Sequence, residues 1–290
     1  MEPHSSKSKR VVGRENYCTK KDTVDICLNC LHECGVIGQG DILLEPSAGM
    51  GVFSDALKEK YPGYTVEAYD IVPNEEHDVV QQNFLDLDTS VYEGKKVHIV
   101  GNPPFGRQAS MVRRFIKKAS WFGSTIAFIL PRSFKKNSMK STFPMKYWLL
   151  KSIDLPEKSF CDSTEEKNYS VPCVFQVWQR RDEDRPEEEP VVPTYYTYVS
   201  KEGEEGVDGA EGEAPSVAIR RVGINAGTIS ATYADKSRQT HYFLRLNQGI
   251  AVNDFIKKYQ ENVRFEEDNT VGPRSVSKEE INKALDGLME

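Results

Sequence analysis

Two turns, each placed directly after a short apolar run, constrain the fold of this chain most. The first, Pro46-Ser-Ala-Gly-Met-Gly51, follows the run Asp41-Ile-Leu-Leu-Glu45 and precedes Val52–Tyr61, a segment with helical apolar spacing. The second, Gly101-Asn-Pro-Pro-Phe-Gly106, follows Val97–Val100 and precedes another such segment. Strands that alternate with helices predict a doubly wound, mainly parallel α/β sheet, which binds ligands at the carboxyl ends of its strands. Both turns should therefore share one crevice.

The composition divides the chain into four parts. Residues 1–13 are polar and basic and predict a flexible tail, whereas residues 14–180 hold the alternating α/β pattern. Residues 181–215 are rich in Glu, Pro and Gly, with twelve acids from Asp182 to Glu213, and predict an acidic disordered loop, in which Val191–Val199 could form a strand. Residues 216–290 predict a small C-terminal β/α extension that could contact a substrate.

The cysteines and the polar N-terminus bear on the cellular setting. No apolar run approaches the roughly 18 residues of a membrane span, and the N-terminus lacks the apolar core of a secretory signal. We therefore expect an intracellular protein, cytoplasmic or nuclear, with reduced thiols and no membrane partner. Cys27, Cys30, His32 and Cys34 have metal-like spacing, but they lie in a helical pattern and no second ligand pair follows. We interpret them as buried helix thiols and predict no metal site.

The residues around the first turn predict a nucleoside cofactor. Asp70 stands nineteen residues after Gly51, at the end of the expected strand Tyr64–Asp70. A carboxylate at that distance suits a pair of ribose hydroxyls, and Gly49 and Gly51 allow a ligand close to the backbone. The turn has neither the G-x-G-x-x-G pattern of NAD sites nor the Gly-Lys-Ser/Thr of a P-loop. Because Glu45 suits the ammonium and sulfonium charges of S-adenosyl-L-methionine, we predict that cofactor.

The second turn predicts the catalytic site, formed by Asn102, Pro103, Pro104 and Phe105. Prolines have no N–H and a fixed φ, so the turn presents the Asn102 side-chain oxygen and the Pro103 carbonyl as acceptors in a rigid frame. A planar exocyclic amine donates two N–H groups, and holding both frees the nitrogen lone pair to attack a methyl group. Positioning then does most of the catalytic work, and Phe105 offers a face for base stacking.

Taken in order, Glu45-Pro-Ser-Ala-Gly-Met-Gly51, Asp70 and Asn102-Pro-Pro-Phe105 resemble the class I S-adenosylmethionine-dependent amino-methyltransferases, in the order of the gamma-class N6-adenine group. The resemblance covers residues 14–180 and implies a Rossmann-like class I methyltransferase fold. It also implies cofactor contacts from the two motifs, namely Glu45, Pro46, Ala48, Gly49, Gly51, Asp70 and Asn102.

Two flanking elements extend the resemblance. Tyr17-Cys-Thr-Lys20 is similar to the Phe/Tyr-x-Thr-Pro element of the family, with Lys20 in place of proline, which implies a cofactor contact from Thr19. Asn83-Phe84 is similar to the Asp-Phe pair that holds the cofactor adenine. Here Asn83 replaces the acid, and Asp86 is a rival for that role.

The charge distribution bears on the acceptor. The net charge is −6, yet no Asp or Glu stands between Glu93 and Asp154, where there are thirteen Lys and Arg. A positive stretch beside the catalytic turn suits a phosphate backbone, so we expect nucleic acid as the substrate and Arg107 as a contact. Family enzymes often sandwich the target base with a second aromatic, which we expect at Phe160, with Phe134 as the alternative.

We therefore predict a methyltransferase that acts on adenine N6 in nucleic acid. Cytosine N4 and the glutamine amide are planar amines too, so a protein N5-glutamine methyltransferase is an alternative, as is a non-catalytic cofactor-binding partner subunit. The segment after the acidic loop is short for a module that reads a long DNA sequence, which slightly favours RNA over DNA. The sequence does not determine the oligomeric state.

Overall fold

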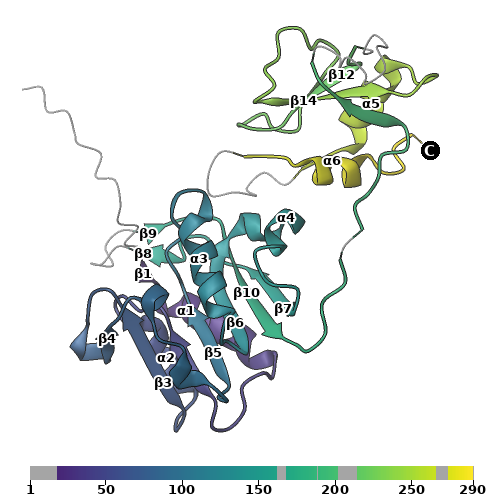
Figure 1. Ribbon diagram of the computed structural model, residues 1–290. Coiled ribbons are helices and arrows are strands. Elements are labelled where there is room, and N and C mark those ends of the chain that lie inside the picture. The colour runs from purple at the N-terminus through teal and green to yellow at the C-terminus, as the bar shows by residue number, and fades with distance from the viewer. Residues whose placement is uncertain (1–17, 162–167, 188, 202–213, 266–273, 290) are drawn as a thin grey trace, which may run out of the picture. The chain divides into compact units, whose positions relative to one another are not determined.

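The computed structural model describes most of the chain (Figure 1), namely residues 18–161, 168–187, 189–201, 214–265 and 274–289. The chain falls into two compact units, divided between Arg185 and Pro186. The expected tail, residues 1–13, lies outside the described residues. In the part of the chain that the structure describes, no helix has the length and apolar character needed to cross a membrane.

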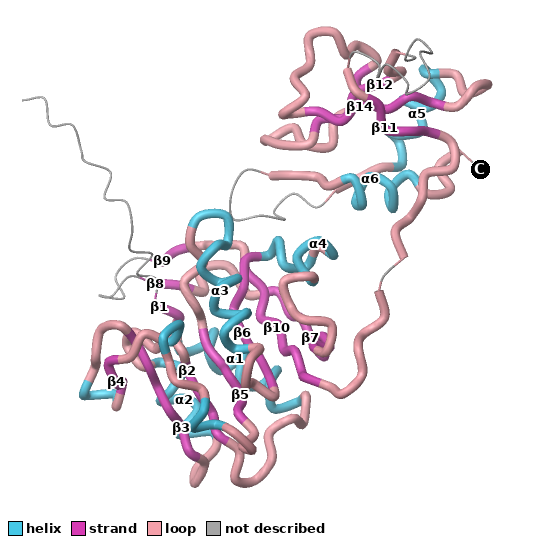
Figure 2. The backbone as a smooth tube through the Cα atoms, viewed as in Figure 1, coloured by secondary structure: helices cyan, strands magenta, loops and turns pink. Residues whose placement is uncertain are grey.

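A seven-stranded sheet of order β4-β3-β2-β5-β6-β10-β7 forms the centre of the first unit (Figure 2). The strands from β4 to β6 are parallel, and β10 runs antiparallel between β6 and β7. A doubly wound, mainly parallel sheet is confirmed, although the pattern did not indicate the reversal at β10. The bounds are β2 (Ile42–Glu45), β3 (Thr65–Asp70), β4 (Val79–Gln81), β5 (Val97–Gly101), β6 (Thr125–Pro131), β7 (Tyr147–Asp154) and β10 (Cys173–Arg180).

Helices cover both faces of this sheet. Successive side chains of a strand point to opposite faces. Leu43 packs with α1 (Lys21–Glu33) and α2 (Val52–Lys60), whereas Leu44 packs with α3 (Ser110–Ala119) on the other face. The central strands are apolar almost throughout because both of their faces are buried.

Short elements complete the first unit. A three-stranded sheet of order β1-β8-β9 places Thr19 opposite Phe160. Its strands are β1 (Cys18–Thr19), β8 (Phe160–Cys161) and β9 (Asn168–Tyr169). The remaining helical turns are η1 (Glu75–His77), η2 (Phe84–Asp86), η3 (Ser90–Tyr92), η4 (Arg107–Ala109), η5 (Arg132–Lys135) and α4 (Asn137–Lys140).

The first unit extends past residue 180, the expected end of the domain, to Arg185. The Arg185 guanidinium lies over the Trp178 ring, 5.5 Å from its centroid. It also donates hydrogen bonds of 2.6 to 3.0 Å to the carbonyl oxygens of Lys140, Phe143, Pro144 and Tyr147. Arg185 therefore fastens the end of this unit to the segment between α4 and β7.

The second unit is an antiparallel sheet of order β11-β14-β12-β13 with two helices. Phe255 of α5, Ile281 of α6 and Leu244 of β14 share its core. Helix α6 begins with the capping box that the spacing of Ser277 and Glu280 indicates. The bounds are β11 (Tyr196–Val199), β12 (Val217–Arg220), β13 (Ile229–Ser230), β14 (His241–Leu246), α5 (Val252–Asn262) and α6 (Lys278–Leu285).

The acidic segment 181–215 differs from the loop that its composition indicates. Strand β11 lies within it and pairs with β14, so part of the segment belongs to the core of the second unit. The Tyr-rich run Tyr195–Val199 buries enough apolar area to form a strand despite its acidic flanks. Residues 202–213 lie outside the described residues.

Candidate functional site

Three strands of the sheet end side by side at the expected crevice. β3, β2 and β5 are neighbours, and Asp70, Glu45 and Asn102 stand at or directly after their carboxyl ends. The Gly49 N–H donates to Oδ2 of Asp70 at 2.9 Å, and the Ser47 hydroxyl donates to the Asn102 carbonyl at 3.3 Å. The structure therefore brings the first turn, the acid of β3 and the second turn together.

The glycine-rich turn contains two left-handed residues, Gly49 at φ +54° and Gly51 at φ +78°. A Cβ atom on Gly49 would meet no atom within 4 Å, so the backbone is open there. Pro46 and Ala48 are buried behind the turn, and the Ala48 N–H donates to the Tyr69 carbonyl at 2.9 Å. The turn is thus hydrogen-bonded to β3, and Gly49 is exposed.

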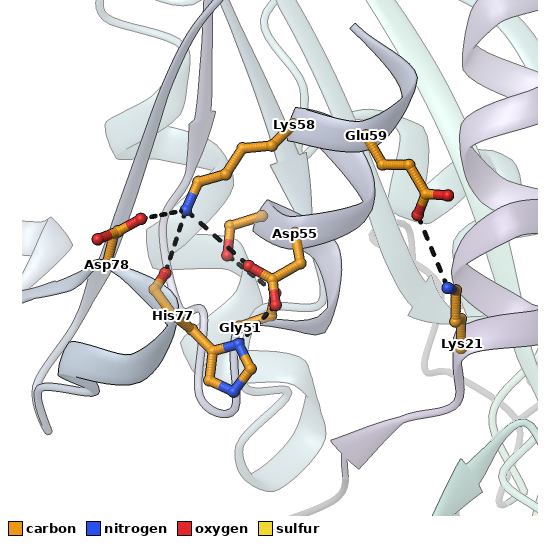
Figure 3. Close-up of polar contacts among 8 residues, drawn as sticks. Lys21, Gly51, Asp55, Lys58, Glu59, His77 and Asp78 are labelled. Carbon is orange, nitrogen blue, oxygen red and sulfur yellow. Dashed lines mark hydrogen bonds and ion pairs between the residues drawn. The ribbon is translucent and has the colours of Figure 1, made fainter. Parts of the chain in front are cut away.

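Gly51 is enclosed by His77, which comes from the turn η1 (Figure 3). A Cβ atom on Gly51 would lie 2.4 Å from the Cβ of His77, so a larger residue does not fit without movement. The Nδ1 atom of His77 lies 2.5 Å from Oδ2 of Asp55 on α2. Lys58 donates to the His77 carbonyl at 3.4 Å and to Asp78 at 2.7 Å. These contacts fasten the β3–β4 connection to the start of α2, and no sequence motif marks them.

Glu45 is a buried carboxyl group beside the turn. It is 2% exposed, and a Cβ atom on Gly101 would lie 3.3 Å from its Cγ. Burial raises the pKa of Glu45 well above its usual value, hydrogen bonds from Ser54 oppose the rise, and the charges of Asp70 and Asp55 add to it. Its Oε2 atom has no hydrogen-bond partner among the described residues. An unpartnered buried carboxyl oxygen fits a cationic group of a ligand.

Asn102 occupies the centre of the site. Its Nδ2 donates to the Thr19 hydroxyl at 3.1 Å, and Thr19 is itself buried in β1. Its Oδ1 atom is buried and, within the described residues, has no hydrogen-bond partner. Leaving a buried acceptor unpaired costs roughly 1–3 kcal/mol, so this oxygen is well suited to accept an N–H group from a ligand.

The segment after Asn102 combines rigidity with strain. Pro103 is buried, Pro104 is exposed, and Phe105 is half-buried against the cores on both faces of the sheet. Gln108 and Ala109 follow with φ of +54° and +59°, a left-handed conformation that costs an L-residue about 1 kcal/mol or more. Strained residues cluster at ligand sites, and these two set the direction in which α3 leaves the turn.

The other predicted residues are divided between surface and core. Arg107 is exposed beside the turn, and Asn83 is exposed and caps η2 with its side chain. Phe84 and Phe134 are each 1% exposed, and Phe160 is 2% exposed. Their burial favours core roles for these three rings, although the backbone of Phe160 lies beside Thr19.

The thirteen cations of the positive stretch have different surroundings. Lys118 is buried, and its Nζ donates to the Leu87 carbonyl at 2.6 Å. Arg132 and Lys135 both pair with Asp154 at 3.2 Å. Exposed cations lie before β5, at the turn and along α3, namely Lys95, Lys96, Arg107, Arg113, Arg114 and Lys117. Arg107, Arg113 and Arg114 of this set leave a positive surface near the second turn, whereas Lys95 and Lys96 precede β5 and lie at its other end.

The cysteines of α1 resemble core residues. Burial raises the pKa of Cys27 well above its usual value and that of Cys30 to about 11, and Cys27 has no exposed surface. Cys34 is half-buried. Among the described residues, no three metal-ligating side chains are grouped so as to hold a metal ion.

Comparison with known proteins assigns a family. Residues 36–189, more than half of the chain, match the family described as the EDM2 methyltransferase-like domain. No curated protein matches the chain.

Solved structures give distant matches. TrmN from Thermus thermophilus is 13% identical over 56% of this chain and 52% of that one, with a TM-score of 0.38. The N-methyltransferase NodS from Bradyrhizobium japonicum, in complex with S-adenosyl-L-homocysteine, is 11% identical over 55% of this chain and 87% of that one (TM-score 0.39). A methyltransferase from Pyrococcus furiosus is 13% identical over 58% and 86% (TM-score 0.34). The chain spans about half the length of TrmN, with 52% covered.

Proposed function

The chain belongs to the family of EDM2 methyltransferase-like domains, and on this premise we propose that it methylates adenine N6 in a nucleic acid. The fold is that of a class I methyltransferase, as predicted, and the cofactor is S-adenosyl-L-methionine. Within that class we propose kinship to the gamma-class N6-adenine group, and RNA ahead of DNA as the substrate. The catalytic residues proposed are Asn102, Pro103, Pro104 and Phe105.

The observation that carries this proposal is the buried, unpartnered Oδ1 atom of Asn102, assessed against the described residues. An exocyclic amine donates N–H groups and would satisfy this acceptor. Thr19 holds the other end of the amide, which fixes the orientation of the side chain. Pro103 and Pro104 have no N–H that could compete for Oδ1. A substrate amine held by its hydrogens keeps its nitrogen lone pair available as the nucleophile.

The residues of the first turn fit the cofactor. The unpartnered Oε2 of Glu45, judged within the described residues, suits its ammonium group. Asp70 accepts hydrogen bonds from the N–H groups of Gly49 and Val72, and a carboxylate has further acceptor capacity for ribose hydroxyls. When bound, the cofactor supplies the methyl group. Further cofactor contacts are proposed from Thr19, Pro46, Ala48, Gly51 and Asn83.

A nucleic-acid substrate is supported by the surface next to the second turn. Arg107 is exposed at that turn, and Arg113, Arg114 and Lys117 are exposed on α3, which follows directly. Lys and Arg neutralise phosphates and release counterions, which makes binding depend on salt. We therefore expect binding of mixed-sequence RNA to weaken steeply as salt rises, whereas a flat salt profile would remove nucleic acid as the substrate.

The catalytic role is tested with Asn102→Ala. We expect methyl transfer to fall about 100- to 1,000-fold, as for the loss of one preorganised polar contact in an active site. Cofactor affinity, measured by calorimetric titration, should stay nearly unchanged. Asn29→Ala, on the exposed face of α1, is the matched control and should leave activity intact. Full activity in Asn102→Ala would show that the site is elsewhere.

The acceptor is identified by labelling. The protein is incubated with isotopically labelled S-adenosyl-L-methionine and total RNA, DNA or protein, and the labelled product is digested and identified by mass. N6-methyladenosine is the expected product. Labelled N5-methylglutamine or N4-methylcytosine would overturn the acceptor but keep the amine chemistry, whereas no labelled product from any pool would contradict the catalytic assignment.

A further inference from the structure

The second unit contains a pocket where β11 ends and β14 begins. Its volume is about 190 Å³, below the roughly 300–1,000 Å³ of pockets that enclose whole small molecules, so it fits one small group. Three of the lining residues carry Lys or Arg side chains and none is acidic. The lining consists of Tyr198, Val199, Ser200, Lys201, Arg238, His241, Tyr242, Phe243 and Lys278.

Aromatic rings hold one of these cations in place. The Nζ atom of Lys278 lies 4.4 Å from the ring centroid of Tyr198 and 6.0 Å from that of Tyr242. Arg221 lies over the Tyr242 ring as well, at 4.8 Å. A cation–π contact orients an ammonium group without cancelling its charge. Lys278 therefore reaches the pocket as a positioned cation with N–H donors for an anionic ligand.

Three acids among the described residues that neighbour the pocket in sequence have partners of their own. Glu279 pairs with Lys283 at 3.1 Å, and Glu280 accepts the N–H of the capping box at 2.8 Å. Asp235 pairs with Lys236 at 2.9 Å. These three carboxylates are already engaged, so the pocket keeps a positive character among the described residues.

A row of basic and aromatic residues continues from the pocket across the sheet. Arg220 and His241 are paired neighbours on β12 and β14 and share one face of the sheet. Phe243 and Arg245 follow His241 at alternate positions and point to that same face, where Phe243 is buried and Arg245 is half-buried. Burial lowers the pKa of His241, a hydrogen bond with the Ser237 backbone and the charge of Asp235 oppose this fall, and the charges of Arg220 and Lys236 add to it. A row of this kind suits a polymer with evenly spaced phosphates better than a single phosphorylated side chain.

We propose that this pocket binds a backbone phosphate of single-stranded nucleic acid, through Lys201, Arg238 and Lys278. The strand would continue along the face that carries Arg220 and Arg245. The choice of nucleic acid over a phosphopeptide rests in part on the proposed function. The pocket itself needs neither the cofactor nor the second turn of the first unit.

The test measures binding of a fluorescent mixed-sequence RNA 12-mer by anisotropy, with the full chain and no cofactor. Arg238→Gln/Lys278→Gln should weaken binding about tenfold and reduce the slope of log K against log salt by about 0.7, since the contact to one phosphate is lost. Lys257→Gln/Lys258→Gln on α5 removes the same charge outside the pocket and should change affinity less than twofold. The variant Arg238→Gln/Lys278→Arg keeps one of the two charges and should recover part of the affinity that Arg238→Gln/Lys278→Gln loses.

Two further measurements separate the outcomes. RNA binding is measured without cofactor and requires no methyl transfer, so the pocket can be confirmed even if no methyl transfer is found. A thermal unfolding scan of each variant shows whether the fold is kept, and a folded Arg238→Gln/Lys278→Gln variant with wild-type affinity and salt slope would overturn the proposal. A phosphopeptide that displaces RNA and binds more tightly than RNA would overturn the choice of nucleic acid.

Discussion

Replacing Gly51 with alanine tests whether His77 leaves no room for a side chain at this position of the first turn. Gly49 and Gly51 both have left-handed backbones, so alanine at either position costs about 1 kcal/mol from φ alone. The two sites differ in space, because the new Cβ meets nothing within 4 Å at Gly49 but lies 2.4 Å from the His77 Cβ at Gly51. Overpacking of this kind adds about 1–3 kcal/mol. We expect Gly51→Ala to be less stable than Gly49→Ala by about 2 kcal/mol, or about 4–8 °C in Tm.

The assay is thermal and urea unfolding of the two variants, together with calorimetric titration of the cofactor. A double-mutant cycle with His77→Gly isolates the contact, since glycine removes the Cβ atom that the new methyl group would meet. We expect Gly51→Ala to regain about 2 kcal/mol in the His77→Gly background, beyond what His77→Gly does alone. Equal stability of Gly49→Ala and Gly51→Ala, or a coupling energy near zero, would refute the reasoning.

Three other predictions concern stability and thiol chemistry. His98 is buried and forms a hydrogen bond of 2.8 Å with Asp41. Burial lowers the pKa of His98. Burial raises the pKa of Asp41, but its hydrogen bonds with His98 and Gly38 outweigh that effect, so the pKa of Asp41 is lowered. The pKa of each group is lower in the folded state than in the unfolded state. The free energy of unfolding should therefore decline as pH falls through about 6.5, because of His98, and again near 4, because of Asp41. A His98→Gln variant whose urea midpoint changes between pH 7 and 5 as that of the wild type does would contradict this prediction. Arg185→Ala should lower the free energy of unfolding by about 2–4 kcal/mol, because its hydrogen bonds to four carbonyl oxygens are lost. A urea midpoint equal to that of the wild type would show that these hydrogen bonds do not stabilise the unit. Cys27 and Cys173 should react with a thiol reagent only after unfolding, because both are fully buried; labelling of the native protein, located by peptide mass, would exclude that.

The strands that the sequence predicts well are those whose residues are buried on both sides. β2 and β5 are apolar runs bounded by turn residues, and their predicted and observed bounds agree within one residue. β4, β1 and β8 were missed because strands of two or three residues carry no period. Their pairing depends on partners elsewhere in the chain, which a local pattern does not contain.

Some parts of the candidate site could likewise be predicted from the sequence, and others could not. Glycine and proline encode backbone requirements directly, so the turns around Gly51 and Asn102 were evident in the sequence. His77 and Ser54 were not, because they reach the turn through tertiary contacts that no spacing indicates. Phe160 stands at the position where the sequence suggests a base-stacking ring, yet its ring is buried. An aromatic residue at an expected position does not reveal whether its ring is exposed to a ligand.

The pairing of β1 with β8 has a consequence for biosynthesis. Thr19 reaches Asn102 through a strand whose partner lies more than a hundred residues downstream, as the separation of 143 between Cys18 and Cys161 shows. Contacts of such high sequence separation form late, because the intervening chain must be ordered first. A nascent polypeptide that ends before β8 has all the residues of both turns yet lacks the strand that orients the Asn102 amide. The amine site that we propose at Asn102 is therefore completed only when the ribosome has passed the end of the parallel sheet, when the domain is nearly complete.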